Sequence, residues 1–249
     1  MTRSAPRFFV DSLEVTASQE VVVKDAGLAH QVGRVLRMQP GDAMIVLNGS
    51  GKEFVVEIVS MSKQEVQGRL MEQRPGNPEP ELLIRLFQAM TKPISKFESV
   101  LQHGTELGVV EFYPLITERT ELRDLRKPER LRAILKEAAE QSERSRMPLL
   151  GEMVSLKKIL EKGLMKNLEA DLNLFAYERE NAFFLADALS SLTKKPKSIN
   201  LWIGPEGGFS DNEVEGARRQ GWSIFGLGPH ILRTETAGLA VVSALRFHL

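Results

Sequence analysis

Hydrophobic and polar positions divide the chain into two stretches with different patterns. Residues 1–73 contain short apolar runs rich in β-branched residues, whereas the remainder alternates such runs with segments whose apolar residues recur at helical spacing. Between them lies RPGNPEPE at 74–81, with three prolines and a glycine. This composition is typical of a domain linker, so we predict two domains, 1–73 and 74–249.

The first domain is predicted to be a small β-barrel of about 70 residues. Four apolar runs are its expected strands, at residues 8–10, 21–23, 43–47 and 53–59. The last two flank the glycine-containing segment NGSGK, which predicts a hairpin. Residues 26–38 have helical spacing that places one apolar face on Leu28, Val32, Val35 and Leu36.

The second domain is predicted to be an α/β domain, with a mainly parallel sheet covered by helices, because strand and helix patterns alternate along it. Expected strands lie at residues 82–90, 111–116, 173–178, 199–203 and 223–228. Helices are expected after Pro93, up to the LGV sequence ending at residue 109, and over 131–142. The sequence contains no internal repeat.

Composition excludes several kinds of chemistry. The chain has no cysteine, which rules out disulfides, thiolate metal sites and thiol nucleophiles. Its four histidines lie apart, at 30, 103, 230 and 248, so we predict no metal site.

No apolar run is long enough for a signal peptide or a membrane span, and we expect a soluble, cytoplasmic protein. Thirty-three basic and thirty-three acidic residues balance, so any contact with nucleic acid must come from local patches.

The segment INLWIGPEGGFSDNEV (199–214) is a buried strand that runs into a glycine-rich loop and then a helix. Ser210 and Glu213 have the spacing of a capping box, so the helix should begin directly after the loop. Ligands of open α/β sheets bind beyond the carboxyl ends of the strands, and three glycines would let the backbone approach one closely. A tight turn that binds nothing is the alternative.

A second segment, residues 223–245, repeats this order of strand, glycine-rich bend and buried helix. Two such loops at adjacent strand ends suggest one shared pocket. The sequence GLGPHI has Ile231 where a dinucleotide-binding fingerprint has its third glycine, and the chain has no phosphate-binding G-x-x-x-x-G-K-[ST] motif. A dinucleotide site and a P-loop are therefore not expected.

GPEGGFS (204–210) and LGPHILRTETA (227–237) resemble the two signature loops of the 16S ribosomal RNA uridine-N3 methyltransferase family, within the SPOUT superfamily. ELGV (106–109) and EQSERSRMP (140–148) are similar to upstream motifs of that family, and residues 30–42 resemble its N-terminal PUA-like domain. One departure is Glu143, where the family pattern has a small residue, usually glycine.

The resemblance implies a PUA-like β-barrel followed by a SPOUT-type domain with a C-terminal trefoil knot, S-adenosylmethionine as cofactor and a homodimer. The implied substrate is 16S ribosomal RNA or the assembled small ribosomal subunit. The cofactor-binding residues that we predict are Phe175, Gly204, Pro205, Glu206, Gly207, Gly208, Leu227, Gly228, Ile231, Leu232, Thr234, Thr236 and Ala237. Residues 175–178, at the end of a neighbouring strand, are expected to complete the pocket, although packing within a buried strand explains Phe175 equally well.

Without cysteine, the chain cannot form the thiol adduct that carbon methylation of pyrimidines usually requires, which favours a nitrogen or oxygen acceptor. Uridine N3 fits, provided that the site stabilises the uridine anion as the proton leaves. We predict this catalytic role for Arg233, with a salt bridge to Glu235 or Glu206 as the alternative. Glu206 is the second catalytic candidate, either as a base or as a residue that shapes the loop.

The basic residues predicted to contact RNA are Arg7, Arg34 and Arg37 in the first domain and Arg144 and Arg146 after the long helix. For each one, ordinary exposure on the surface is the alternative. Two other functions stay open. The protein could be another SPOUT RNA methyltransferase that modifies a ribose 2′-oxygen, or an RNA-binding ribosome assembly factor without catalysis.

Overall fold

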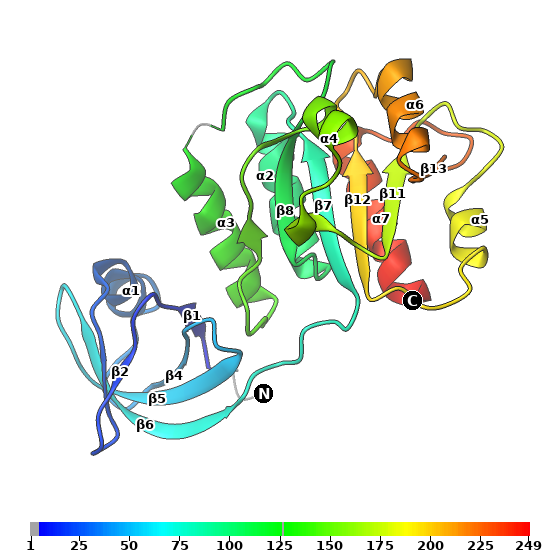
Figure 1. The fold of residues 1–249 in the computed structure, drawn as a ribbon. Helices are drawn as coiled ribbons and strands as arrows, with labels where there is room; N and C mark the ends of the chain where they lie inside the picture. Colours follow the sequence, from blue (N-terminus) through cyan, green and yellow to red (C-terminus); the bar gives the residue numbers. More distant parts are fainter. Residues whose placement is uncertain (1–4, 126) are drawn as a thin grey trace. The chain divides into compact units, whose positions relative to one another are not determined.

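The structure, a computed structural model, describes residues 5–125 and 127–249 and forms two compact units (Figure 1). The first unit runs to Glu79 and also takes in Ala139–Met147. The second consists of Pro80–Ala138 and Pro148–Leu249. The first unit thus extends beyond residue 73, where we predicted its end, and includes a segment from the second half of the chain.

The first unit contains a six-stranded sheet in the order β1-β4-β5-β6-β3-β2. Its strands are β1 (Arg7–Phe9), β2 (Glu14–Val15), β3 (Glu20–Val23), β4 (Ala43–Leu47), β5 (Lys52–Met61) and β6 (Val66–Pro75). Strands β4 and β5 pair antiparallel, which confirms the predicted hairpin. Strand β6 reaches into the predicted linker, because Pro75 still pairs with Lys52.

The helical insertion of the first unit changes type partway. Helix α1 (Ala26–His30) begins where the Asp25 side chain accepts a hydrogen bond from Leu28 N, and it continues as a π-helical turn over Gln31–Val35. Leu28 and Val32 are buried as predicted, but Val35 and Leu36 are exposed, so the predicted apolar face is wrong for these two. A π turn closes i→i+5 bonds and rotates the following residues away from the α-helical face.

The segment 139–147 belongs to the first unit because its polar and apolar groups pack there. Ala139, at the end of helix α3 (Pro128–Gln141), is buried with Phe9, Ile45 and Leu47. The Glu140 carboxylate accepts from Phe9 N at 2.8 Å, and Asn77 donates to Glu143 O at 2.8 Å. A periodic helix pattern shows that the helix exists, but it does not show which unit the end of that helix joins.

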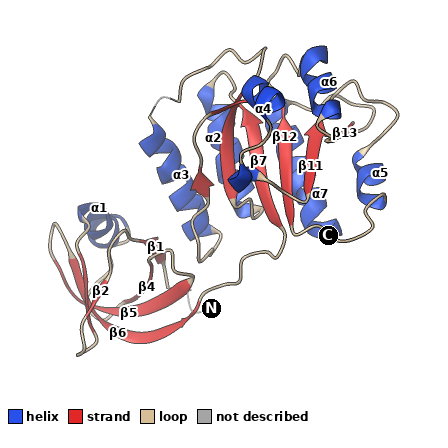
Figure 2. Ribbon diagram, viewed as in Figure 1, coloured by secondary structure: helices blue, strands red, loops and turns tan. Residues whose placement is uncertain are grey.

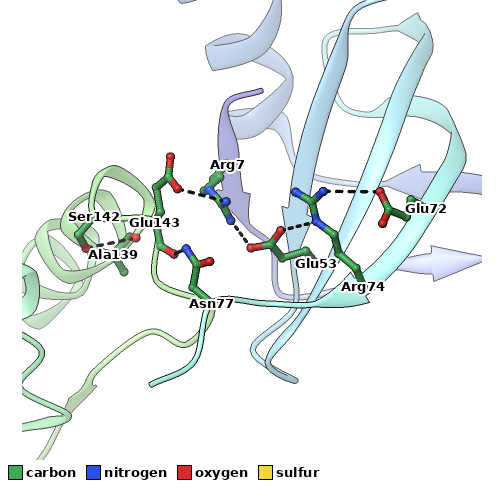
Figure 3. A network of polar contacts seen from close by, with 8 residues as sticks. All are labelled: Arg7, Glu53, Glu72, Arg74, Asn77, Ala139, Ser142 and Glu143. Carbon is green, nitrogen blue, oxygen red and sulfur yellow. Dashed lines mark hydrogen bonds and ion pairs between the residues drawn. The ribbon is translucent and has the colours of Figure 1, made fainter. Parts of the chain in front are cut away.

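A buried carboxylate connects charged groups of the first unit (Figure 3). Glu53, 2 % exposed, accepts hydrogen bonds from Arg7 and from Arg74 Nε, the latter at 2.9 Å. Arg7 also lies 3.4 Å from the carboxylate of Glu143, whose backbone has a φ of 57°. That left-handed conformation favours glycine, the residue that the resemblance leads us to expect at this position.

The second unit is a parallel seven-stranded sheet in the order β10-β8-β7-β12-β11-β13, with β9 beside β8 (Figure 2). Its strands are β7 (Leu83–Ala89), β8 (Glu111–Ile116), β9 (Leu149–Leu150), β10 (Val154–Ser155), β11 (Leu172–Ala176), β12 (Ser198–Ile203) and β13 (Ser223–Phe225). The parallel sheet and its five predicted strands are confirmed. Within the described residues, every strand pairing of this sheet is parallel.

Helices cover both faces of this sheet. On one face lie α2 (Ile94–Glu106), α3, α5 (Leu185–Ser190) and α7 (Thr234–His248), which share a core with Leu86, Leu201 and Ile203. On the other lie α4 (Leu156–Lys162), a 3₁₀ turn (Lys166–Leu168) and α6 (Asp211–Arg219). The second face is aromatic, since Trp202 stacks between Phe87 and Trp222 with ring centroids 3.9 and 4.4 Å apart. Successive residues of each strand alternate between the two cores.

Helix α7 follows the edge strand β13 yet packs against the central strands β12 and β7 and against α2. The chain therefore returns from the edge of the sheet to its middle through residues 226–233. Within residues 5–125 and 127–249, no helix is both long and apolar enough to cross a membrane.

Glu53→Gln should destabilise the protein in a pH-dependent way. Burial raises the pKa of Glu53, but hydrogen bonds and charge from Arg7 and Arg74 bring it below its usual value of 4.5. Its ionised form thus stabilises the fold above about pH 4.5, and this contribution is lost as the pH falls through the lowered pKa. At pH 7 we expect a loss of about 3–5 kcal/mol in the free energy of unfolding.

Chemical denaturation of the wild type and the variant between pH 7 and pH 3 measures this difference. The control is Glu72→Gln, because Glu72 is more than half exposed and contacts Arg74 only at 3.5 Å. A difference between wild type and Glu53→Gln that stays constant over this pH range would contradict the assignment.

Candidate functional site

A cavity of about 520 Å³ opens beyond the carboxyl ends of β11, β12 and β13. The arrowheads of β11 and β12 point to the same edge of the sheet, so the loops that follow these strands meet there (Figure 1). The cavity is lined by Lys96 of α2 and by residues 176–179, 203–208, 227–228, 230–235 and 237. The shared pocket predicted for the two glycine-rich loops is therefore present.

Most of the predicted cofactor-binding residues line this cavity, but two do not. Phe175 is fully buried, and its ring packs 4.0 Å from that of Phe209, which fits the alternative of packing within a buried strand. Residues 176–178 of the same segment line the cavity instead. Thr236 is exposed on the first turn of α7 and is absent from the lining in the described part of the chain.

Hydrogen bonds fix the end of the first loop, residues 204–210, where helix α6 begins. The predicted capping box is confirmed, since Glu213 N donates to Ser210 Oγ and Ser210 N donates to Glu213 Oε2 at 2.9 Å. Glu213 Oε1 accepts from Glu118 N at 2.8 Å. Gly208 has a φ of 66°, a left-handed conformation that favours glycine, and the Glu178 carboxylate occupies the space beside it that a Cβ would take.

Arg119 holds the middle of the first loop. Its Nη1 donates to Gly207 O at 2.8 Å and to Phe209 O at 3.2 Å, and its aliphatic carbons pack beneath Gly207. Arg119 is not among the site residues that the sequence predicted. Its role depends on backbone carbonyls 88 and 90 residues away, which no local pattern could identify.

Glu206 lies at the tip of the first loop and pairs with Lys96. Its Oε1 accepts from Lys96 Nζ at 3.0 Å and from Lys92 N at 3.3 Å. Partial burial raises the pKa of Glu206, but these hydrogen bonds and the Lys96 charge lower it below its usual value. An ionised carboxylate held in this way is a weak base, so the geometry favours the role of shaping the loop. Sequence reasoning missed Lys96.

Arg233 occupies the position before the first turn of α7, lines the cavity and is exposed. The alternative of a salt bridge with Glu235 or Glu206 is not found, and no ion pair to Arg233 occurs among the described residues. Its guanidinium donors are thus available to a molecule in the cavity. Arginine is always charged, so these donors suit an oxygen that develops negative charge.

The second loop begins at Gly226, which pairs with Phe184 and leaves no room for a side chain because Glu180 O lies 2.1 Å from the site of a Cβ. Further along, Leu232 is half-buried against the apolar core, whereas Ile231 is 79 % exposed at the cavity. The two residues therefore differ in how they can contact a ligand, although the sequence suggested equal roles.

The predicted RNA-contacting arginines fall into two groups in the first unit. The side chains of Arg7 and Arg144 are only 8 % and 9 % exposed and pair with Glu53 and Glu79. Their burial leaves little surface to contact a phosphate. Arg34 and Arg37 are exposed, as is Arg146, which donates to Ser50 O at 3.3 Å.

No group of three or more histidine, aspartate or glutamate side chains is arranged to hold a metal ion in the part of the chain that the structure describes. The cavity is lined by glycines, apolar side chains and charged side chains that include the Lys96–Glu206 pair, which suits an organic ligand.

Comparisons with known proteins cover nearly the whole chain. Residues 78–246 match the RNA methyltransferase domain family, and residues 30–71 match the RNA methyltransferase PUA domain family. The chain is 36 % identical to ribosomal RNA small subunit methyltransferase E of Bacillus subtilis, over 88 % of this chain and 86 % of that protein. It is 34 % identical to the protein of the same name from Synechocystis, over 98 % of this chain and 80 % of that protein.

Solved structures have the same fold. A methyltransferase from Legionella pneumophila in complex with the cofactor SAM superimposes with a TM-score of 0.85 at 30 % identity, over 98 % of both chains. Ribosomal RNA small subunit methyltransferase E from Neisseria gonorrhoeae, bound to S-adenosyl methionine, gives a TM-score of 0.84 at 26 % identity, again over 98 % of both chains.

Proposed function

Since this chain belongs to the ribosomal RNA small subunit methyltransferase E family, we propose that it methylates N3 of one uridine in 16S ribosomal RNA, with S-adenosylmethionine as the methyl donor. The observation that carries this proposal is the cavity between the two loops, with the unpaired Arg233 at its edge. Its volume of about 520 Å³ is suitable for a ligand of this size. Relatives with 98 % coverage contain the same cofactor.

The residues of the cavity have different parts in the reaction. When bound, S-adenosylmethionine would supply an electrophilic methyl group, and the residues that would hold it are 204–208, 227–228 and 230–232. N3 of the uridine would release its proton to solvent and form a bond to the methyl carbon as the bond from that carbon to sulfur breaks, with S-adenosylhomocysteine as the other product. Arg233 donates to a uridine oxygen and stabilises the anion that forms as the proton leaves. Glu206, paired with Lys96, keeps the first loop in shape.

Arg34 and Arg37 are proposed as RNA contacts of the first unit. They flank Val35 and Leu36, which are 63 % and 46 % exposed, so cationic and apolar groups are adjacent around the π-helical turn. Such a surface can pair with phosphates and pack against unstacked bases of single-stranded RNA.

The proposal extends to the assembly and the chain path. A homodimer is supported by large exposed apolar side chains such as Phe247, and sedimentation equilibrium of the purified chain tests it.

A trefoil knot in the last third of the chain is supported by the return of α7 from edge strand β13 to the central strands. An experimental structure that traces residues 198–249 continuously tests the threading.

Small ribosomal subunits that lack the modification, incubated with the protein and labelled S-adenosylmethionine, should yield N3-methyluridine. The nucleoside is identified by mass spectrometry after digestion of the RNA, and naked 16S RNA is assayed in parallel to determine which substrate is used. A methyl group on a ribose would instead support the alternative of a SPOUT methyltransferase that modifies a ribose 2′-oxygen. Cofactor binding without transfer to either substrate would favour the non-catalytic assembly factor.

Arg233→Ala should bind S-adenosylmethionine normally but turn over about 100- to 1,000-fold more slowly, the usual effect of removing one donor to a developing anion. Arg233→Lys keeps the charge but not the planar guanidinium, so its turnover should lie between that of the wild type and that of Arg233→Ala. Arg219→Ala, which removes an exposed arginine of α6, is the control. Wild-type turnover in Arg233→Ala would exclude this residue from the mechanism.

Arg34→Ala and Arg37→Ala should each weaken RNA binding. Each should also make the fall of the log association constant with log salt concentration less steep by about one unit, without changing the free energy of unfolding. Arg7→Ala serves as a contrast, because it breaks a buried ion pair and should mainly lower the free energy of unfolding. Filter binding at several salt concentrations and thermal unfolding measure the two effects. Unchanged salt slopes in both exposed variants would argue against this surface.

A further inference from the structure

Gln88 is a completely buried amide at the end of β7, on the face of the sheet that carries Ile84 and Leu86 and packs against α7. Its Nε2 donates to Thr234 Oγ1 at 2.8 Å and, at 3.4 Å, to Ala89 O. Its Oε1 is buried without a hydrogen-bond partner among the residues that the structure describes. An unpaired buried oxygen destabilises a fold, and a leucine at this position would avoid that penalty.

Thr234 transmits the contact of Gln88 to the first loop. It is the first residue of α7 and lines the cavity, and its hydroxyl donates to Gly204 O at 2.5 Å. A hydroxyl has a single hydrogen, so accepting a bond from Gln88 leaves that hydrogen for Gly204. This short series of hydrogen bonds joins three segments: the end of β7, the start of the first loop and the start of α7.

The other side of the Gln88 amide lies against α7. A Cβ at Gly238 would stand 3.1 Å from Gln88 Oε1, closer than most side-chain contacts, so the amide occupies space that glycine leaves open. Gly238 directly follows Ala237, which lines the cavity. Both ends of the Gln88 amide therefore face the helix whose first turn forms one wall of the site.

We propose that Gln88 is a positioning residue for the cofactor site. It does not line the cavity in the described structure, and it acts through Thr234 by fixing the spacing between the first loop and the start of α7. The chain keeps a buried, incompletely paired amide here because this spacing determines how tightly the two loops hold their ligand. The identity of that ligand, S-adenosylmethionine, rests on the proposed function.

The test compares cofactor affinity with stability in a set of variants. Gln88→Leu removes both polar atoms at similar size, Thr234→Val removes the hydroxyl, and Thr234→Ser keeps it. Asn200→Leu is the matched control, because Asn200 is also a fully buried amide with an unpaired oxygen, in the adjacent strand β12. Its partners, Leu168 O and Asn173, lie on the opposite face of the sheet.

Calorimetric titration with S-adenosylmethionine and S-adenosylhomocysteine gives affinities, and thermal unfolding without ligand gives stabilities. Gln88→Leu should bind about tenfold more weakly, the loss expected for about one hydrogen bond, while its melting temperature without ligand stays the same or rises. Thr234→Val should bind as weakly or more weakly, and Thr234→Ser should regain most of the affinity. The double variant Gln88→Leu/Thr234→Val should bind no more weakly than Thr234→Val alone, because both residues act through one contact.

Three outcomes would overturn the inference: wild-type affinity in Gln88→Leu, additive losses in the double variant, or an equal loss of affinity in Asn200→Leu. A fall in melting temperature with unchanged affinity would likewise assign Gln88 to folding alone. These outcomes are distinct from a failure of the proposed function. If the wild-type chain bound neither ligand, the cofactor assignment itself would fail, whereas a different methylated nucleotide would leave the role of Gln88 untouched.

Discussion

The central position of β12 in the parallel sheet determines how the site is built. Because β12 lies between β7 and β11, its carboxyl end has neighbours on both sides, and the loop that follows it can be held from both. Helix α7 must leave the edge strand β13 and return to β12 to bury its apolar side chains, among them Val241 and Leu245. The second loop connects β13 to α7, and because α7 packs at β12, this loop lies against the first loop, which follows β12. Burial of one helix thus forms the cavity.

The sequence predicted the features that depend on neighbours along the chain. Alternation and helical spacing located the five main strands of the second unit, and the Ser210–Glu213 spacing located the start of α6. The two glycine-rich loops revealed where the cavity would be, since glycine and proline constrain the backbone locally. By contrast, the π-helical turn at 31–35 depends on a hydrogen-bonding pattern that apolar spacing does not encode, so Val35 and Leu36 were misplaced.

Residues that hold the site from a distance could not be found in this way. Gln88 contacts a residue 146 positions later, Lys96 one 110 positions later, and Arg119 carbonyls about 90 positions later. Each is a polar residue whose purpose is defined by the partner that the fold brings to it. Arginines show the same ambiguity, because a sequence does not distinguish Arg7, which is buried against Glu53, from Arg34, which is exposed. In the first unit, burial rather than residue type separates Arg7 and Arg144 from the exposed Arg34 and Arg37.

The inclusion of residues 139–147 in the first unit has a consequence for the order in which the protein folds during synthesis. Phe9 N bonds to a side chain 131 residues later, so the first unit cannot be completed until β7, α2, β8 and α3 have left the ribosome. Until then, the surface formed by Phe9, Ile45 and Leu47 lacks Ala139 and stays open to solvent. Contacts at such large sequence separation slow folding, and nascent chains with uncovered apolar surface are prone to aggregate. Although most of the first unit precedes the second in the sequence, it can complete its folding only after part of the second unit has been synthesised.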